Sequence, residues 1–178
     1  MEATETVTKD IFTKIKVLDF PKIFQCIDAP REMDENLQRH SLNVAFTNGV
    51  IGQWLKLPEP VIKKLVCAGL VHDIGKTKEL SLFPQNDYTN DGQLLGHIMI
   101  GAEMVHDAAQ KIDGFPQELE NQLKHCILAH HGELEYGSPK KPAMVEAVAL
   151  NLADNADAKM ETLTELFDAA PAGNEWLG

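Results

Sequence analysis

Near the middle of the chain, the residues from Val61 to Ile74 are almost wholly apolar beyond Lys63 and Lys64. A helix that is hydrophobic on nearly all sides has to be covered by other elements, so this segment predicts a buried central helix. Gly75 follows it directly, and we expect this glycine to close the helix as its C-cap. The remaining elements must therefore pack around this helix.

Helical patterns recur along the rest of the chain, whereas strand signals are weak. Few alternating β-branched runs occur, and aromatic residues make up only 6% of the sequence. The further helices that we expect are 8–18, 21–27, 32–55, 91–112, one from the turn at 114–116 to about 130, and 143–169. Loops are expected at 77–90 and in the stretch HGELEYGSPKKP. The pattern predicts an all-α, bundle-like domain.

The 178 residues are enough for one domain, and we expect its core to lie within about 32–168. The three cysteines show no CxxC spacing, and Cys67 and Cys126 lie in apolar runs, which indicates buried free thiols in a reducing cytoplasm. No apolar run reaches the roughly 18 residues that span a bilayer. The opening MEATETVTKD also lacks the apolar segment of a secretion signal. We therefore expect a cytoplasmic protein without a membrane partner.

The charge balance restricts the partners of the chain. It carries 16 Lys and Arg residues against 27 Asp and Glu residues, a formal net charge of −11. Proteins that bind duplex nucleic acid through its backbone present a basic face, so the balance argues against a dedicated duplex-binding module. A phosphate substrate stays compatible with this charge, because bound divalent cations would supply local positive charge.

His40 lies on a stripe of helical spacing with Val44, Thr47, Ile51 and Leu55, so it should face the core. A lone histidine on an apolar stripe is more often a hydrogen-bonded core residue than a metal ligand. The setting of the other histidines decides between these two interpretations.

His72 and Asp73 follow the apolar run LVCAGLV. A buried carboxylate beside a buried imidazole is unfavourable without compensation. Neighbouring residues on a helix do not face each other, but both can reach a cation that lies off the helix end. The alternative is an Asp–His pair that only ties the helix terminus, and we favour the metal interpretation.

His97 lies on its predicted helix between Gly96 and Gly101, and these glycines would let another backbone or a cluster of metal ligands approach closely. His130 and His131 come at a helix end, where adjacent side chains can spread around one site.

Asp154 falls in the final helix among small and apolar neighbours. Each of these residues has a separate explanation as a capping or hydrogen-bonding group. Together, however, four predicted helices aim imidazole or carboxylate groups inward. Mixed ligation of this kind suits Fe, Mn, Zn, Ni or similar ions.

A second His-Asp dipeptide, His106-Asp107, serves as an internal comparison. It lies in the middle of a helix, and His106 comes nine residues after His97, about 180° around the helix. We expect this pair to be solvated and not to bind metal. His125 either supports the His130 region or hydrogen-bonds within the core.

The order His40, His72-Asp73, His97, His130, Asp154 resembles the HD phosphohydrolase superfamily in its two-metal form. From about 34 to 78, the stretches DENLQRHSLNVA, GQWLKLP and AGLVHDIGKTK are similar to HD-GYP cyclic-dinucleotide phosphodiesterases. From 88 onward, YTNDGQLLGHI, LKHCILAHHGELEYGSPKKP and ALNLADNADAK are similar to the HD domain of YhaM-type 3′–5′ exoribonucleases. The Gly-Tyr-Pro element that defines HD-GYP proteins is absent. The resemblance implies a single HD-domain helical bundle over 1–178.

The resemblance also implies a site for two divalent metal ions, of which Fe, Mn, Ni, Zn and Mg are candidates. The first ion would be held by His40, His72, Asp73 and Asp154. The second would be held by His97 and His130, with Asp73 bridging and His131 close by. Two cations about 3.5–4 Å apart can clamp a phosphate and acidify a water that attacks it.

Lys76 lies three positions after Asp73 in the sequence, and it has two interpretations. It either steadies a phosphate oxygen or protonates the leaving group, or it only complements the dipole at the helix end.

The leading functional hypothesis is a metal-dependent phosphodiesterase or phosphohydrolase. Its substrate would be a nucleotide, a cyclic dinucleotide or a short RNA phosphoester. The alternative is a signalling module whose HD site binds metal or nucleotide without turnover. A purely structural zinc site is disfavoured, because such sites are usually closed by four ligands with many cysteines.

Overall fold

The computed structural model describes residues 35–81, 85 and 87–170 of the chain. Its elements are α3 (Glu35–Trp54), α4 (Glu59–Val71), α5 (Lys76–Glu79), α6 (Asn90–Gln110), α7 (Gln117–Ala129), the 3₁₀ helix η2 (Leu134–Tyr136) and α8 (Val145–Ala169). Within these ranges, extended backbone pairs only at one bridge, between Leu80 and Tyr88. The all-α prediction is confirmed, while the predicted helices 8–18 and 21–27 lie outside the described residues.

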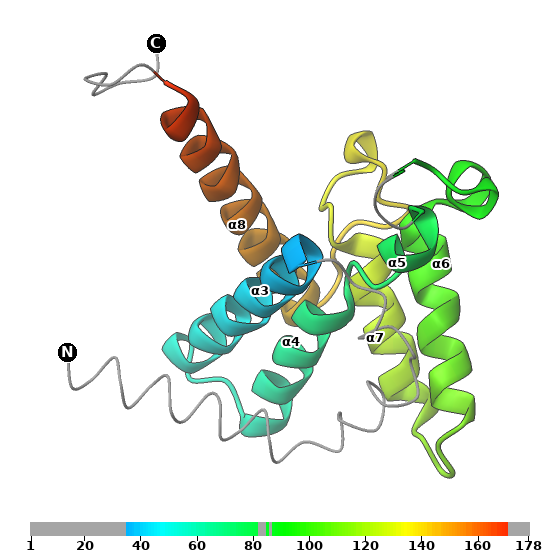
Figure 1. Cartoon of the computed structure of the whole chain (residues 1–178). Coiled ribbons are helices and arrows are strands. Elements are labelled where there is room, and N and C mark those ends of the chain that lie inside the picture. Colours follow the sequence, from blue (N-terminus) through cyan, green and yellow to red (C-terminus); the bar gives the residue numbers. More distant parts are fainter. Residues whose placement is uncertain (1–34, 82–84, 86, 171–178) are drawn as a thin grey trace.

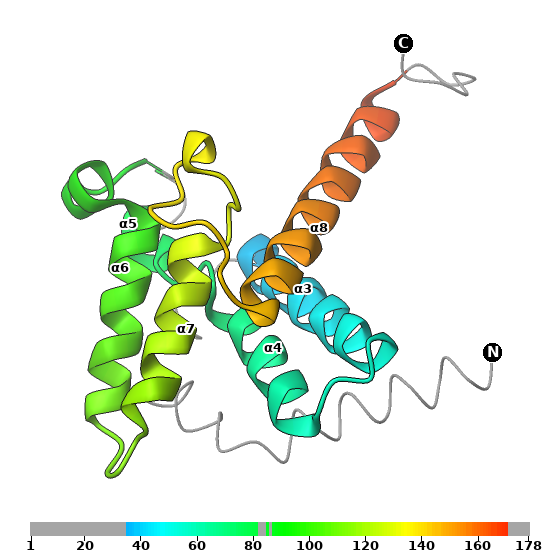
Figure 2. The ribbon, with the colours of Figure 1, turned by 180° about the vertical axis from the view of Figure 1, so that it is seen from behind.

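Helix α4 lies in the middle of this arrangement (Figures 1 and 2). It packs against α3, α7 and α8, while α6 lies alongside α7 and the single turn of α5 rests on α6. The C-terminal half of α8 extends as an arm beyond the other described helices. None of the described helices is long and apolar enough to cross a membrane.

The interior of the domain consists of two main hydrophobic clusters that meet at α4. Cys67 and Val71 pack in one cluster with residues of α6 and α7. Ala68, on another face of the helix, packs with Val44 of α3 and Leu150 of α8. All of these side chains are buried, so the predicted central buried helix is confirmed.

The two cysteines that the structure describes are buried free thiols, as the sequence predicts. Burial raises the pKa of Cys126 to about 12 and that of Cys67 well above its usual value. Because the thiolate is the reactive form, both side chains act as small core residues.

The predicted role of Gly75 as a C-cap is wrong. Helix α4 ends at Val71, and Gly75 has φ −63° and ψ −22°, a right-handed conformation that any residue adopts. Glycine is required there for a different reason: an added Cβ would lie 2.0 Å from the carbonyl oxygen of His97 and 2.7 Å from the backbone nitrogen of Gly101. The absent side chain lets the turn after α4 approach α6. The short helix α5 then begins at Lys76, and the rest of it lies in the stretch 77–90 that the sequence predicts as a loop.

The buried face of α3 also differs in part from the predicted stripe. Val44 is buried as expected, but Leu55 lies just past the helix end and is 50% exposed. The buried side of α3 consists largely of small residues, and a Cβ on Gly69 of α4 would lie 2.6 Å from the Cα of Ala45. Close contact between the two backbones, rather than the larger apolar side chains, therefore determines which face of α3 is buried.

The contact at Gly75 can be tested by substitution. We expect Gly75→Ala to lower the free energy of unfolding by about 2 kcal/mol or more, because the added methyl group overlaps backbone atoms that cannot move independently. Gly114→Ala is the matched control, since Gly114 has φ +69° but open space around its Cβ position. It should cost about 1 kcal/mol through backbone strain alone. Urea unfolding of both variants measures the difference, and equal losses would contradict the packing explanation.

Candidate metal centre

A first cluster of polar side chains forms where α3, α8 and the end of α4 meet. It consists of His40, His72, Asp73 and Asp154. The Nε2 atom of His40 lies 3.1 Å from Oδ1 of Asp154 and 3.2 Å from Nε2 of His72. The Nε2 atom of His72 lies 3.5 Å from Oδ2 of Asp73. Residues that are far apart in the sequence thus direct two imidazole nitrogens and two carboxylate oxygens to one point.

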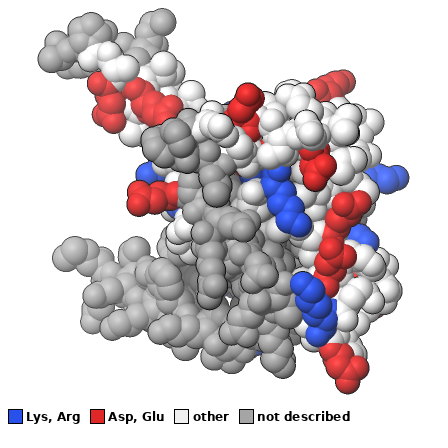
Figure 3. Space-filling model, turned by 45° about the vertical axis from the view of Figure 1, so that its right-hand side comes forward, with Lys and Arg blue, Asp and Glu red and all other residues white. Residues whose placement is uncertain are grey.

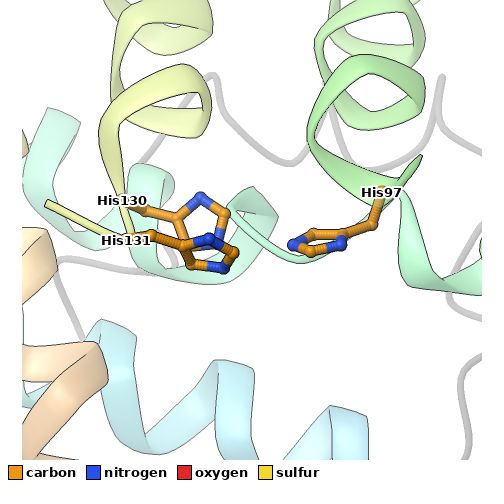
Figure 4. Close-up of side chains that lie close together, drawn as sticks. All are labelled: His97, His130 and His131. Carbon is orange, nitrogen blue, oxygen red and sulfur yellow. The ribbon is translucent and has the colours of Figure 1, made fainter. Parts of the chain in front are cut away.

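A second cluster lies on the other side of Asp73 and consists of His97, His130 and His131. Their imidazole rings face one another from α6 and from the end of α7 (Figure 4). Oδ1 of Asp73 lies 3.6 Å from Nε2 of His97 and 3.5 Å from Nε2 of His130. Asp73 therefore turns one carboxylate oxygen toward each cluster.

The chemistry of these atoms fits divalent metal ions. Oδ1 of Asp73, Nε2 of His97 and Nε2 of His130 are buried and have no hydrogen-bond partner among the described residues. Leaving such a group unsatisfied costs about 1–3 kcal/mol. A single cation would satisfy all three atoms, and imidazole with carboxylate is a ligand set that first-row divalent ions accept. Three residues of the first cluster, His40, His72 and Asp73, also bring ligand atoms within 4.8 Å of one another, as do the three histidines of the second.

All five histidines are held through Nδ1, which leaves Nε2 directed at the clusters. Backbone carbonyls accept the Nδ1 hydrogen bond in three cases: Gly69 for His72 at 2.9 Å, Ile127 for His130 at 2.7 Å, and Tyr136 for His131 at 2.9 Å. In the neutral ring, such outer hydrogen bonds select the tautomer in which Nε2 carries the lone pair that can bind a metal ion.

Carboxylates hold the two remaining histidines. Nδ1 of His40 donates to Asp157 at 2.7 Å, and Nδ1 of His97 donates to Glu79 at 3.1 Å. Neither acid is among the site residues predicted from the sequence. Asp157 follows Asp154 by nearly one helical turn, a spacing that indicates a shared face of α8. Glu79 carries no comparable signal, because it is 18 positions from His97 and on another helix.

The environment sets the protonation states of the carboxylates. Burial alone would raise the pKa of Asp73, but the adjacent His72 and Lys76 hold that pKa well below its usual value. Burial acts in the same direction on Asp154, and hydrogen bonds from His40 and His72 lower its pKa in spite of it. Both carboxylates are therefore ionised at neutral pH.

The histidines of the two clusters respond differently. The hydrogen bond to Asp154, followed by the one to Asp157, raises the pKa of His40 to about 9 against the effect of burial. Burial, with the nearby His72, lowers the pKa of His130 to about 3, so this ring is neutral. The neutral ring of His130 is thus in the state that metal binding requires, whereas His40 has to lose a proton when a metal ion binds beside it.

Lys76 begins α5 and extends its ammonium group to Oδ2 of Asp73, at 2.6 Å. Both residues line a pocket of about 540 Å³. The pocket is also lined by Asn36, Leu37, His40, His130, His131, Asp154, Ala158, Glu161 and Glu165. The first cluster and the histidine pair at the end of α7 thus open into one cavity between α3 and the arm of α8.

The comparison dipeptide lies away from both clusters. The side chain of His106 is 49% exposed, and its Nδ1 donates to Oε1 of Glu120 at 2.7 Å. Asp107 is exposed as well. His125 accepts a hydrogen bond from the backbone nitrogen of Ala143 at 3.0 Å, which ties α7 to the segment that leads into α8.

The part of the chain that contains both clusters is similar in sequence to known proteins. The family profile of the HD domain matches residues 37–159, which is more than half of the chain. The 3′–5′ exoribonuclease YhaM of Shouchella clausii is 41% identical over 112 residues, which is 62% of this chain and 35% of that protein. The YhaM protein of Bacillus subtilis is also 41% identical over 112 residues, again 62% of this chain and 35% of that protein. That of Oceanobacillus iheyensis is 40% identical over 119 residues, 66% of this chain and 37% of that protein.

The chain thus spans about a third of the length of these curated relatives. No solved structure matches it. The matched segment, 37–159, contains both polar clusters, and its helices are those that the structure describes. The HD domain is a helical fold associated with divalent metal binding, in agreement with the two clusters. The chain belongs to the HD domain family.

Proposed function

We propose that this chain is a metal-dependent phosphohydrolase that holds two divalent cations and cleaves a phosphodiester of a nucleotide or a short RNA. One observation carries the proposal: the buried carboxylate of Asp73 presents one oxygen to each of two clusters of metal-binding side chains. Because a single cation would leave the other cluster unsatisfied, the arrangement favours a pair of ions.

The two positions differ in charge. His40, His72, Asp73 and Asp154 form the proposed first position, which combines two imidazoles with two carboxylates. The second position combines the imidazoles of His97 and His130 with the shared Asp73, and His131 lies beside them. The first position thus contains one more carboxylate than the second, and we expect it to be filled first.

A pair of bound divalent cations clamps a phosphate and lowers the pKa of a water molecule. The described residues would supply the rest of the chemistry. Asp73 fixes the two positions relative to each other. Lys76 contributes an ammonium group within the same pocket, where it can bind a phosphate oxygen or donate a proton to the leaving-group oxygen.

The comparisons support a nucleotide or RNA substrate, because the relatives that match at about 40% identity are named 3′–5′ exoribonucleases. A pocket of about 540 Å³ is also within the range typical of small-molecule sites. The alternative, a module that binds metal or nucleotide without turnover, is disfavoured because all of the expected metal ligands are present and the pocket is lined by several of them. Hydrolysis of bis-p-nitrophenyl phosphate with added Mn²⁺ separates the two possibilities.

Metal content tests the two-cation centre directly. The wild-type chain should bind close to two equivalents after reconstitution, as measured by elemental analysis. Asp73→Ala should lose both ions and hydrolysis, because its carboxylate serves both positions, whereas His97→Ala should lose mainly the second ion. Asp107→Ala, the exposed acid of the comparison dipeptide, should change neither metal content nor activity.

A ceiling of one equivalent in the wild-type chain would contradict the two-cation centre and leave a mononuclear site. Loss of metal from the Asp107 variant but not from the Asp73 variant would place the centre elsewhere. Thermal stability is a poor substitute for metal content here, because removing a buried ligand also removes the unfavourable burial of its charge.

The outer wall of the pocket is acidic. It includes Glu161 and Glu165 from the arm of α8, and Glu161 forms an ion pair with Arg39 of α3. Among the described residues, no cation forms an ion pair with Glu165. On the face that Figure 3 shows, acidic side chains gather on the projecting arm, and lysine and arginine side chains are scattered singly. This arrangement favours substrates that bring few phosphates beyond the one that is cleaved.

We therefore expect short oligonucleotides and small phosphodiesters to be better substrates than long RNA or cyclic di-GMP. Glu165→Gln should raise kcat/KM for a longer oligonucleotide about threefold at low salt, because it removes a like charge from the path of the following phosphates. It should leave the rate on bis-p-nitrophenyl phosphate unchanged. Glu103→Gln, which removes an exposed charge from α6 outside the pocket, is the control. Efficient cleavage of cyclic di-GMP by the wild-type chain would contradict this preference.

A further inference from the structure

We propose that Glu79 is a positioning residue that sets the affinity of the second metal position through His97. This inference rests on the proposed function, and it concerns a residue outside the set of expected ligands. Glu79 ends α5 and is buried. Among the described residues, its hydrogen bonds to the second cluster all go to His97, so its influence on that cluster has to pass through this residue.

A single carboxylate oxygen of Glu79 fixes His97 at two points. Oε1 accepts a hydrogen bond from the backbone nitrogen of His97 at 2.9 Å and another from its Nδ1 at 3.1 Å. The hydrogen bond to the backbone nitrogen fixes the position of the His97 backbone, and the hydrogen bond to Nδ1 fixes the orientation of its imidazole ring. Nε2, the remaining ring nitrogen, is then directed toward Oδ1 of Asp73 at 3.6 Å.

The backbone of α6 makes this contact possible. Gly96 has φ 73° and ψ 158°, values outside the helical region, so α6 is kinked immediately before His97. The residues after the kink begin a new helical segment whose first N–H groups lack partners within the helix. Glu79 places a carboxylate at this start, where the helix dipole also favours a negative charge.

Glu79 itself is held in place by the beginning of α6. Its carbonyl oxygen accepts a hydrogen bond from the backbone nitrogen of Thr89 at 2.9 Å. A Cβ at Gly92 would lie 2.2 Å from the same carbonyl oxygen, so glycine permits this close approach. The carboxylate therefore acts from a fixed position and not from a mobile surface side chain.

The negative charge of Glu79 should affect metal affinity in addition to the effect that Glu79 has on the orientation of the His97 ring. Of the side chains at the second position, only Asp73 is a carboxylate, and the first position shares it. A carboxylate hydrogen-bonded to the far nitrogen of a histidine raises the basicity of the nitrogen that binds metal. Glu79 thus supplies a further carboxylate near the second position, which has fewer carboxylates than the first. Asp157 stands in the same relation to His40 at the first position, at 2.7 Å.

The competing explanation is that Glu79 only stabilises the junction of α5 and α6. The chain contains a matched control for it. Glu120 is also a buried carboxylate that accepts a hydrogen bond from a histidine Nδ1, that of His106 at 2.7 Å, and it belongs to neither cluster. A purely structural effect of losing such a pair should appear in both variants, whereas an effect on metal should appear only at Glu79.

The experiment measures binding of Mn²⁺ to the metal-free full chain by competition with a chromophoric chelator. Glu79→Gln keeps an oxygen that can accept both hydrogen bonds but removes the charge. We expect this substitution to weaken binding of the second equivalent of Mn²⁺ about tenfold or more and to leave the affinity for the first equivalent unchanged. Glu120→Gln should leave both equivalents unchanged, and Asp157→Asn should weaken the first. Thermal unfolding in chelator checks that each variant folds.

Glu79→Asp, which retains the charge, provides a second variant should the glutamine variant fail to fold. Its second equivalent should bind less tightly than in the wild-type chain but more tightly than in Glu79→Gln. Unchanged binding of the second ion in a folded Glu79→Gln, or equal weakening of both ions, would overturn the inference. A wild-type chain that binds fewer than two ions would instead contradict the proposed function, and the inference with it.

Discussion

The buried carboxylate of Asp73 lies between the two polar clusters, and the rest of the structure is arranged around it. It follows the central helix α4, so the apolar packing of that helix fixes its position. An ionised carboxylate at this depth would be strongly unfavourable alone, and neighbouring imidazoles and the ammonium group of Lys76 keep its pKa low. The core thus holds a charge that only a set of polar partners can stabilise, which links stability to the candidate metal centre.

Close backbone contacts bring those partners within reach. At Gly75 and Gly101, the turn after α4 lies against α6 at a distance that a side chain on Gly75 would prevent. At Gly96, the kink in α6 turns the following residue, His97, toward Asp73. These glycines therefore affect the candidate metal centre through the backbone: Gly75 lets the turn after α4 approach α6, and Gly96 allows the kink that places His97.

The sequence predicted features that depend on local pattern and missed those that depend on contacts between distant segments. The apolar run of α4 and the order of histidines and aspartates were sufficient to predict a central helix and the residues that the structure brings together. The C-cap assigned to Gly75 was wrong, because its close neighbour, His97, lies on another helix. Glu79 was missed for the same reason, since its carboxylate meets His97 only after α5 folds onto α6. Long-range contacts of this kind leave no periodic signal.

The two His-Asp dipeptides show how context decides chemistry. In each, the histidine Nδ1 is hydrogen-bonded, by Gly69 in the case of His72 and by Glu120 in the case of His106. The difference lies at the other ring nitrogen and at the aspartate. His72 follows the end of a buried helix, where the backbone turns and Asp73 can share its surroundings. His106 lies mid-helix, where the next side chain points about 100° away. At a buried helix end, both side chains of a His-Asp dipeptide can therefore reach one metal ion. Within a helix, the two side chains of the same dipeptide point to different faces.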